Sequence, residues 1–368
     1  MAEHLRKRHL ELAPGAQAGG LQLSRSTRGR RAGIIALLAL VLAVVIAAGI
    51  GSVQIPADEV MRIILSRVPG ITVDRTWPQA HETILLSVRL PRVLMGALVG
   101  MALAVAGCAY QGLFKNPLAD PYILGVSAGS GLGAALVIAG LGSLPVTFLG
   151  AVPAGAFAGG ILTMLVVYSL AAHGSRVSTV SLLLSGVAVG SICSSLISLV
   201  VYFTDSASRD AIVFWMMGGL SGANWPKVAW LLPYLGVGAG ILLFYGKELN
   251  ALLMGEEQAQ HLGVEVERVK KIVLLGGTLL TAGAVAFSGT IGFVGMLVPH
   301  LVRILIGPDH RYLLPVSGLV GGVVLVTADA LARSLLAAVE IPVGLVMAVV
   351  GGPFFLWLLR RRMIPQDR

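Results

Sequence analysis

Continuous apolar runs recur about ten times along this chain, and each is close to the roughly 20 residues that an α-helix needs to cross hydrocarbon. None shows the alternation of a bacterial β-barrel strand. With 56% hydrophobic and 12% charged residues, the 368-residue chain is too apolar for a water-soluble globule. The sequence predicts an all-α, polytopic membrane protein with about ten transmembrane helices. The expected spans are residues 32–53, 93–113, 122–141, 148–171, 179–203, 226–246, 271–290, 293–306, 313–332 and 342–360.

Positive charge gathers in the two terminal tails. Cytoplasmic segments of membrane proteins are enriched in Lys and Arg, so both termini are predicted to be cytoplasmic. The net charge of +9 then reflects orientation and contact with anionic membrane lipid, and it gives no support for nucleic-acid binding. The tail residues concerned are Arg6, Lys7, Arg8, Arg25, Arg28, Arg30, Arg31, Arg360, Arg361 and Arg362.

Three segments are expected along the chain. Residues 1–31 read as a basic cytoplasmic tail that is disordered, residues 32–362 as one ten-helix transmembrane domain, and residues 363–368 as a second cytoplasmic tail. The first apolar run follows a long charged stretch and lacks a clear cleavage site, so a retained helix is expected rather than a signal peptide. Cys108 and Cys193 lie within expected spans and are predicted to be packing residues rather than a disulfide or metal pair.

Glycine is unusually frequent, with 47 residues, and many glycines are four positions apart. Small residues allow helix backbones to approach closely in lipid, where no hydrophobic drive brings helices together. A compact bundle is therefore expected, with packing as the role of most glycines and helix sliding as an alternative for a few. The pairs are Gly96 and Gly100, Gly125 and Gly129, Gly129 and Gly133, Gly155 and Gly159, Gly186 and Gly190, and Gly236 and Gly240.

Ionisable side chains are scarce within the spans. Asp329 is the only acidic residue well inside one, and it precedes Arg333 by four residues, which predicts an ion pair within a helix. His300 has no nearby Cys, His or carboxylate, so a packing or pore-lining role is expected rather than a metal-ligand role. The chain offers no catalytic or metal-binding constellation and no G-x-x-x-x-G-K-[ST] loop, so we expect a transport subunit rather than an enzyme, with any ATP bound by another polypeptide.

Two polar segments interrupt the apolar pattern. The stretch "KNPLADP" at residues 115–121 must form a turn because its prolines cannot continue a helix, and irregular backbone at membrane depth survives only beside protein or a water cavity. Residues 247–271 are predicted to form short helices with one apolar side, which suits docking to a soluble partner; a loop on the lipid headgroups is the alternative.

A series of short motifs along the chain resembles the FecCD permease family, the membrane subunits of type II ABC importers for iron siderophores, haem and cobalamin. The resemblance covers roughly residues 33–362, in order and at the family's spacing. The motifs are RLPR (89–92), NPLADP (116–121), GVSAG (125–129), WMMGGL (215–220), GEEQAQHLGV (255–264), SGTIGFVGMLVPHLVR (288–303), GPDHR (307–311) and EIPVG (340–344).

The resemblance implies a multi-pass subunit of a bacterial inner membrane that pairs with a second permease, as a homodimer or a pseudo-dimer. It also implies two ATP-binding subunits, which hold the ATP and Mg, and a substrate-binding protein; no cofactor is expected on this chain. A metal chelate is the expected substrate, with ferric siderophore or haem preferred and cobalamin as the alternative. An ion-gradient-driven secondary transporter is the alternative from another class, but the missing mid-membrane carboxylates count against it.

The resemblance also assigns three groups of residues. Arginines at the outer face would dock the binding protein, the turn at residues 115–121 would form a cytoplasmic gate with the loop before the fifth span, and the helices near 252–266 would couple to the ATPase. The docking residues are Arg89, Arg92 and Arg333. The gate residues are Asn116, Leu118, Ser178 and Thr179, and the coupling residues are Gly255, Glu256, Ala259, Leu262 and Gly263.

Overall fold

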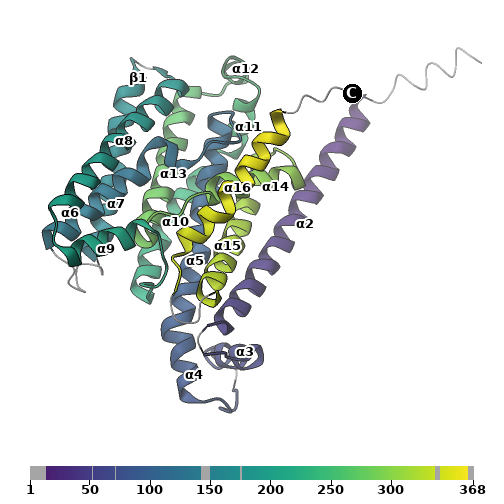
Figure 1. Cartoon of the computed structure of the whole chain (residues 1–368). Coiled ribbons are helices and arrows are strands. Elements are labelled where there is room, and N and C mark those ends of the chain that lie inside the picture. The colour runs from purple at the N-terminus through teal and green to yellow at the C-terminus, as the bar shows by residue number, and fades with distance from the viewer. Residues whose placement is uncertain are drawn as a thin grey trace, which may run out of the picture.

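The computed structural model describes residues 14–51, 53–70, 72–141, 150–174, 176–335 and 340–363, which form a bundle of helices (Figure 1). The first part contains α2 (Pro14–Gly49), α3 (Ala57–Leu65), α4 (Gln79–Thr83), the π-helix η1 (Ile84–Arg89), α5 (Leu90–Leu113), the 3₁₀-helix η2 (Pro121–Leu124), α6 (Val126–Leu141) and α7 (Val152–Ala171). The second contains α8 (Thr179–Phe203), α9 (Ser206–Met216), α10 (Trp225–Phe244), α11 (Gly246–Leu253), α12 (Glu256–His261), α13 (Val266–Ser288), α14 (Val294–Ile306), α15 (His310–Ser334) and α16 (Val343–Met363). Between α7 and α8, β1 (Ala172–His173) pairs antiparallel with β2 (Arg176–Val177).

The apolar helices reproduce the predicted spans. Within the described ranges, seven helical segments are long and apolar enough to cross a membrane, judged by length and composition. Three shorter apolar helices are Val126–Leu141, Val294–Ile306 and Val343–Trp357. Together these segments correspond one to one with the expected spans, so the predicted all-α membrane fold is confirmed.

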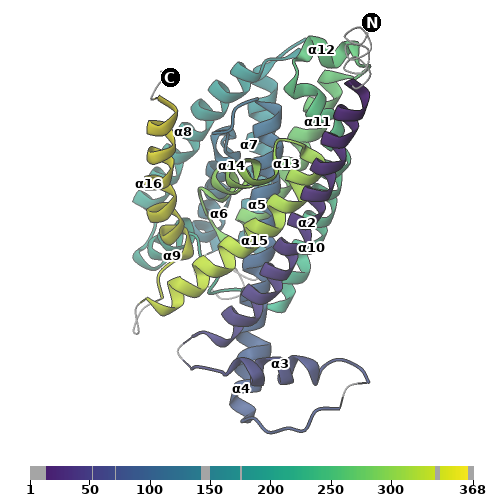
Figure 2. The same cartoon turned by 90° about the vertical axis from the view of Figure 1, so that its right-hand side faces the viewer.

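The bundle has two distinct ends (Figure 2). The two ends of the described chain lie on the same side as α11 and α12, which we call the α12 end, and α3 and α4 lie at the opposite side, the α3 end. Residues 14–31, expected to belong to a disordered tail, form the first part of α2, because a helix once nucleated gains a hydrogen bond with each added residue. Residues 1–13 and 364–368 of the expected tails lie outside the described residues.

The centre of the bundle is α5, which is buried along almost its whole length against α13, α14 and α15. Two of its glycines, Gly100 and Gly107, lie against backbone of neighbouring helices: a Cβ added at Gly100 would lie 2.2 Å from the carbonyl oxygen of Gly321. A Cβ at Gly240 would have no atom within 4 Å, and the same holds for Gly236. The glycine spacing thus marks tight helix contacts at some pairs, whereas the Gly236 and Gly240 pair makes no such contact with the part of the chain that the structure describes.

Candidate functional site

Arg89 caps the end of the first spanning helix at the α3 end of the bundle. Its Nη1 donates to the carbonyl oxygens of Ala48 at 3.1 Å and Gly49 at 2.9 Å, and its Nη2 donates to the carbonyl of Val53. The last carbonyls of a helix lack partners within the helix, and they carry the negative end of its dipole. The guanidinium therefore satisfies the C-terminus of α2, and Arg89 is only 5% exposed.

Arg333 caps the same helix end from α15. Its Nη1 donates to the carbonyl of Ile50 at 2.7 Å and its Nη2 to that of Ala47 at 3.0 Å. Its Nε lies 3.0 Å from Oδ2 of Asp329, so the predicted ion pair within one helix is confirmed. Two arginines from different helices therefore hold the end of α2.

Asp329 also binds Arg92 of α5, a contact that the sequence did not predict. Arg92 Nε lies 3.1 Å from both carboxylate oxygens, and its Nη2 lies 3.0 Å from Oδ1. Arg92 Nη1 donates to Oε2 of Glu340 at 2.7 Å. Asp329 is 2% exposed while the Glu340 side chain is 55% exposed, so the network runs from the interior of the bundle to its surface.

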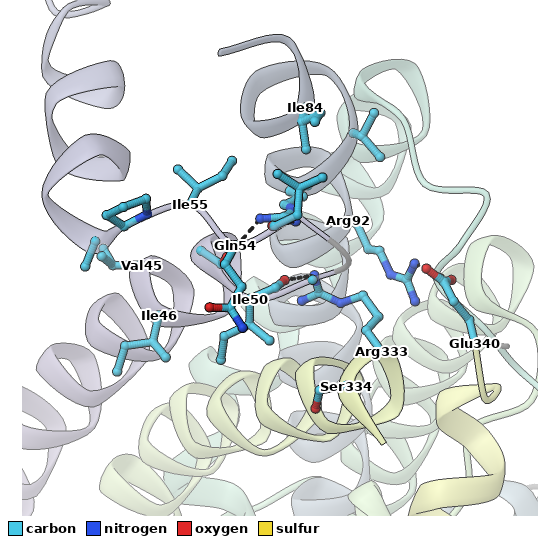
Figure 3. A pocket seen from close by; sticks show the side chains of 17 residues that line it. Val45, Ile46, Ile50, Gln54, Ile55, Ile84, Arg92, Arg333, Ser334 and Glu340 are labelled. Carbon is cyan, nitrogen blue, oxygen red and sulfur yellow. Dashed lines mark hydrogen bonds and ion pairs between the residues drawn. The ribbon is translucent and has the colours of Figure 1, made fainter. Parts of the chain in front are cut away.

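All three arginines expected to dock a binding protein line one cavity of about 1180 Å³, together with Glu340 and Ser334 (Figure 3). The structure therefore brings Arg89, Arg92 and Arg333 together, as their predicted common role requires. Their guanidinium groups are already bound by carbonyls and carboxylates of the same chain. Docking stays a prediction for them, and the structure adds a second role, which is to fix the ends of α2, α5 and α15 to one another.

The residues expected to form the gate lie in a tight turn and at a helix start. In the turn between α5 and η2, the side chain of Asn116 accepts a hydrogen bond from Leu118 N at 3.0 Å, and Lys115 has a φ of 50°. Ser178 caps α8, with its Oγ accepting from Ser181 N at 3.3 Å, and Thr179 is the first residue of that helix. The predicted turn is confirmed; its action as a gate stays a prediction.

The turn continues into η2, which packs against α8 and the start of α14. A Cβ added at Gly186 of α8 would lie 2.5 Å from the carbonyl oxygen of Ile123. Tyr122 Oη donates to the carbonyl of Ile291 at 2.6 Å and accepts from the Ile291 N–H at 2.7 Å. Because residues 290–293 before α14 are not helical, this hydroxyl satisfies backbone groups that lack a helical partner.

The expected coupling residues surround α12. Gly255 and Gly263 flank the helix with φ values of 127° and 82°, a backbone region that side-chain-bearing residues rarely adopt. Ala259 is fully buried, whereas Leu262, directly after α12, is 65% exposed. Glu256 forms an ion pair with Lys270 of α13. α12 thus packs inward through Ala259, and the exposed apolar Leu262 directly after it is one that a partner could contact.

Asn250, Asp309 and His310 join α11 to the start of α15 and were not predicted as a group. Asn250 Nδ2 donates to Asp309 Oδ1 at 2.7 Å, and its Oδ1 accepts from His310 N at 2.8 Å. Burial alone would raise the pKa of Asp309, but the hydrogen bonds from Arg311 and Asn250 outweigh it and lower the pKa. The "GPDHR" motif contains Asp309 and His310 and was a signal in the sequence for this site. No sequence pattern pointed to their partner on α11, Asn250.

Other candidate ligands do not assemble into a site. Cys108 and Cys193 are free and buried, as predicted for packing residues. His300 is buried within α14, so its predicted packing or pore-lining role is compatible with its position. Among the described residues, no group of three or more His, Cys, Asp or Glu side chains could hold a metal ion.

Comparison with known proteins gives consistent matches. Residues 38–361 match the model of the FecCD transport family. The chain is 46% identical over 288 residues to the "Cobalamin import system permease protein BtuC" of Halobacterium salinarum, covering 78% of this chain and 76% of the relative. It is 42% identical over 282 residues to the "Hemin transport system permease protein HmuU" of Yersinia pestis, covering 75% and 83%.

A solved structure also matches. It is titled "An inward-facing conformation of a putative metal-chelate type ABC transporter", and it aligns with a TM-score of 0.77 at 33% identity over 90% of this chain and 99% of that one. The family match thus runs from within α2 to within α16 and includes every apolar helix between them. The chain belongs to the FecCD transport family.

Proposed function

We propose that this chain is the permease subunit of an ATP-driven importer that moves a metal chelate across the cytoplasmic membrane. The observation that carries the proposal is the family match over residues 38–361, and the similar structure titled as a metal-chelate type ABC transporter supports it. The α12 end would face the cytoplasm, because basic residues are concentrated toward it. Arg28, Arg30 and Arg31 lie in the half of α2 that runs to this end, and Arg360 lies in the last turn of α16.

The ATP-binding subunits would dock at α11 and α12. ATP and Mg would be held by those subunits, and this chain would carry no cofactor. Exposed apolar side chains offer contact surface there: Leu253 and Met254 at the end of α11, and Leu262 directly after α12. Movement of a docked ATPase would then reach the helices that follow, which is the kind of rigid-body coupling that alternating access requires.

The second permease would be another copy of this chain. Helix α8 exposes apolar side chains along most of its length, among them Leu184, Val187 and Leu196. It also exposes Ser191 and Ser194, whose hydroxyls donate to the carbonyls four residues earlier. A surface with both apolar and hydroxyl groups fits a water-containing pathway between two subunits better than a surface in contact with lipid alone.

The binding protein would meet the α3 end, where the three arginines and Glu340 line their cavity. Ferric siderophore or haem is the first substrate class to test. Cobalamin is the second, because the relative from Halobacterium salinarum is named for cobalamin import. An ion-driven carrier is disfavoured, since Asp329 is held between Arg92 and Arg333 and offers no free carboxylate for a coupling ion.

Co-purification tests the proposed function directly. The tagged chain is extracted from its native membrane, associated proteins are identified by mass spectrometry, and ATP hydrolysis is measured with candidate binding proteins that carry haem, a ferric siderophore or cobalamin. A P-loop subunit whose hydrolysis rises with one loaded binding protein is the expected result. A complex shown to survive extraction but without an ATPase would contradict the proposal.

The substitution Leu262→Glu is expected to weaken ATPase docking at least tenfold while the isolated subunit stays folded. The side chain is exposed, so the change leaves the core intact, and it places a charge in an apolar contact. ATPase binding by the purified permease and its thermal unfolding midpoint are the two measurements. Val68→Glu, at an exposed site beyond α3, is the matched control. Equal ATPase affinity in both variants would exclude Leu262 from the docking surface.

A further inference from the structure

Lys270 is a buried cation whose three partners belong to different elements. It lies in the second turn of α13 and is 4% exposed. Its Nζ lies 2.7 Å from Glu256 Oε2, 3.1 Å from Glu267 Oε1 and 3.2 Å from the carbonyl oxygen of Val177. A lysine ammonium has three donors, and here each has an acceptor.

This cluster connects the element assigned to ATPase coupling with the element assigned to the gate. Glu256 begins α12, and its side chain is partly exposed, within reach of a docked partner. Val177 is the last residue of β2 and directly precedes Ser178, which caps α8. One ammonium group therefore joins the first residue of α12 to the residue before the α8 cap.

Glu267 makes the connection to Val177 stiff. While its Oε1 binds Lys270, its Oε2 accepts a hydrogen bond from Val177 N at 2.9 Å. The N–H of Val177 is thus bound by the carboxylate and its carbonyl by the ammonium. Both backbone groups of this residue are held from the start of α13, so a displacement of that helix turn would be passed to Val177.

The ion pair with Glu256 is the part of the cluster that can respond to a partner. Glu256 is the more exposed of the two carboxylates, with 42% of its side chain exposed against 28% for Glu267, while Val177 is buried. A docked subunit that moves α12 would therefore pull on Lys270 through this single charged contact. A buried ammonium that loses one of its carboxylates must find another partner or shift, because an uncompensated buried charge is costly.

We propose that Lys270 is a positioning residue that transmits movement of α12 to the start of α8. This inference rests on the proposed function, since it takes α12 as the ATPase contact and the region of Ser178 as part of the gate. In this arrangement displacement of Glu256 shifts the ammonium, and the ammonium shifts the backbone of Val177. The cap of α8 then moves with α12 rather than independently of it.

The test uses the complete transporter, with its ATPase subunits and binding protein, in nanodiscs and in proteoliposomes. The variant Lys270→Met keeps a long apolar stem but removes all three donors. Two quantities are measured: the number of substrate molecules imported per ATP hydrolysed, and the change in thiol labelling of a Ser178→Cys reporter between nucleotide-free and nucleotide-bound states. The native cysteines, Cys108 and Cys193, are buried and serve as the labelling background.

For Lys270→Met we expect at least a tenfold fall in substrate imported per ATP and loss of the nucleotide-dependent change in labelling. Lys271→Met is the matched control, because that neighbouring lysine is exposed, and it should leave both quantities unchanged. Lys270→Arg should recover part of the coupling, because it keeps a cation that can bind both carboxylates. A Lys270→Met transporter with the coupling ratio and labelling change of the unmodified protein would overturn the proposal.

Glu256→Gln keeps the test decisive if Lys270→Met fails to assemble. This change breaks only the outer ion pair, and it should lower the same coupling ratio and reduce the labelling change; normal values for both would also overturn the proposal. A merely structural role for Lys270 would lower the amount of assembled complex without altering substrate imported per ATP. Failure of the proposed function is distinct, because the unmodified complex would then show no ATP-dependent import at all.

Discussion

Asp329→Asn is expected to destabilise the protein by about 3–5 kcal/mol, because it removes the carboxylate that two buried guanidinium groups share. Arg92 and Arg333 both contact Asp329 at 3.0 Å, and the side chains of both are at most 10% exposed. Glu340 still binds Arg92 in the variant, but Arg333 keeps only the carbonyls of Ala47 and Ile50 at the end of α2. The cost arises from leaving positive charge uncompensated rather than from the lost attraction alone.

Chemical unfolding in mixed micelles would measure this change. Asp210→Asn is the control, because Asp210 is an exposed aspartate in α9 and its loss should change the unfolding free energy by less than about 0.5 kcal/mol. In the double variant Asp329→Asn with Arg92→Gln, the effects should be less than additive, since each removes part of the same pair. Additive effects, or an unchanged unfolding free energy in Asp329→Asn, would show that the network does not stabilise the bundle.

The spans and the ion pair within α15 could be predicted because they depend on nearby residues. A run of apolar residues is itself the requirement for a spanning helix, and Asp329 and Arg333 meet because they are four residues apart on one helix. The bond between Arg92 and Asp329 joins residues 237 positions apart, so it depends on how α5 and α15 are aligned. No local pattern contains that alignment.

The burial of Arg89 and Lys270 also could not be predicted from nearby residues. Arginine in "RLPR" at the end of an apolar run suggests a surface residue, and the structure turns it inward because the C-terminus of α2 offers free carbonyls there. Lys270 lies in a polar stretch that reads as exposed, yet α12 and β2 cover it. In both cases the deciding partner comes from a segment distant in sequence, and a buried polar group must have such a partner.

Glycine spacing identified candidates for close packing without showing which would meet another backbone. Gly155 lies against Gly133, where an added Cβ would be 2.9 Å from a carbonyl oxygen, whereas Gly236 faces open space. Both belong to pairs four residues apart, so the spacing is the same and the environment differs. The difference follows from which side of each helix another helix covers, and only the assembled bundle specifies this.

Gly107→Ala is expected to destabilise the bundle by about 1–3 kcal/mol, because the new methyl group meets backbone that cannot rotate away. A Cβ at Gly107 would lie 1.9 Å from the carbonyl oxygen of Gly295 and 2.5 Å from its Cα. This contact holds α14 against α5. Relief would require one helix to move by more than an ångström, which would also disturb the hydrogen bonds from Gln111 to the carbonyls of Gly295 and Met296.

Gly240→Ala provides the matched control, since the same change occurs inside a spanning helix with no atom within 4 Å of the added Cβ. Replacing glycine by alanine in a helix favours the helix by up to about 1 kcal/mol where nothing is contacted, so the control should be neutral or stabilising. Unfolding free energies of the two variants, measured in the same micelles, should therefore have opposite signs or differ by at least about 1 kcal/mol. Equal effects would mean that α5 and α14 do not touch through their backbones, and the central contact of the bundle would then have to be placed elsewhere along α5.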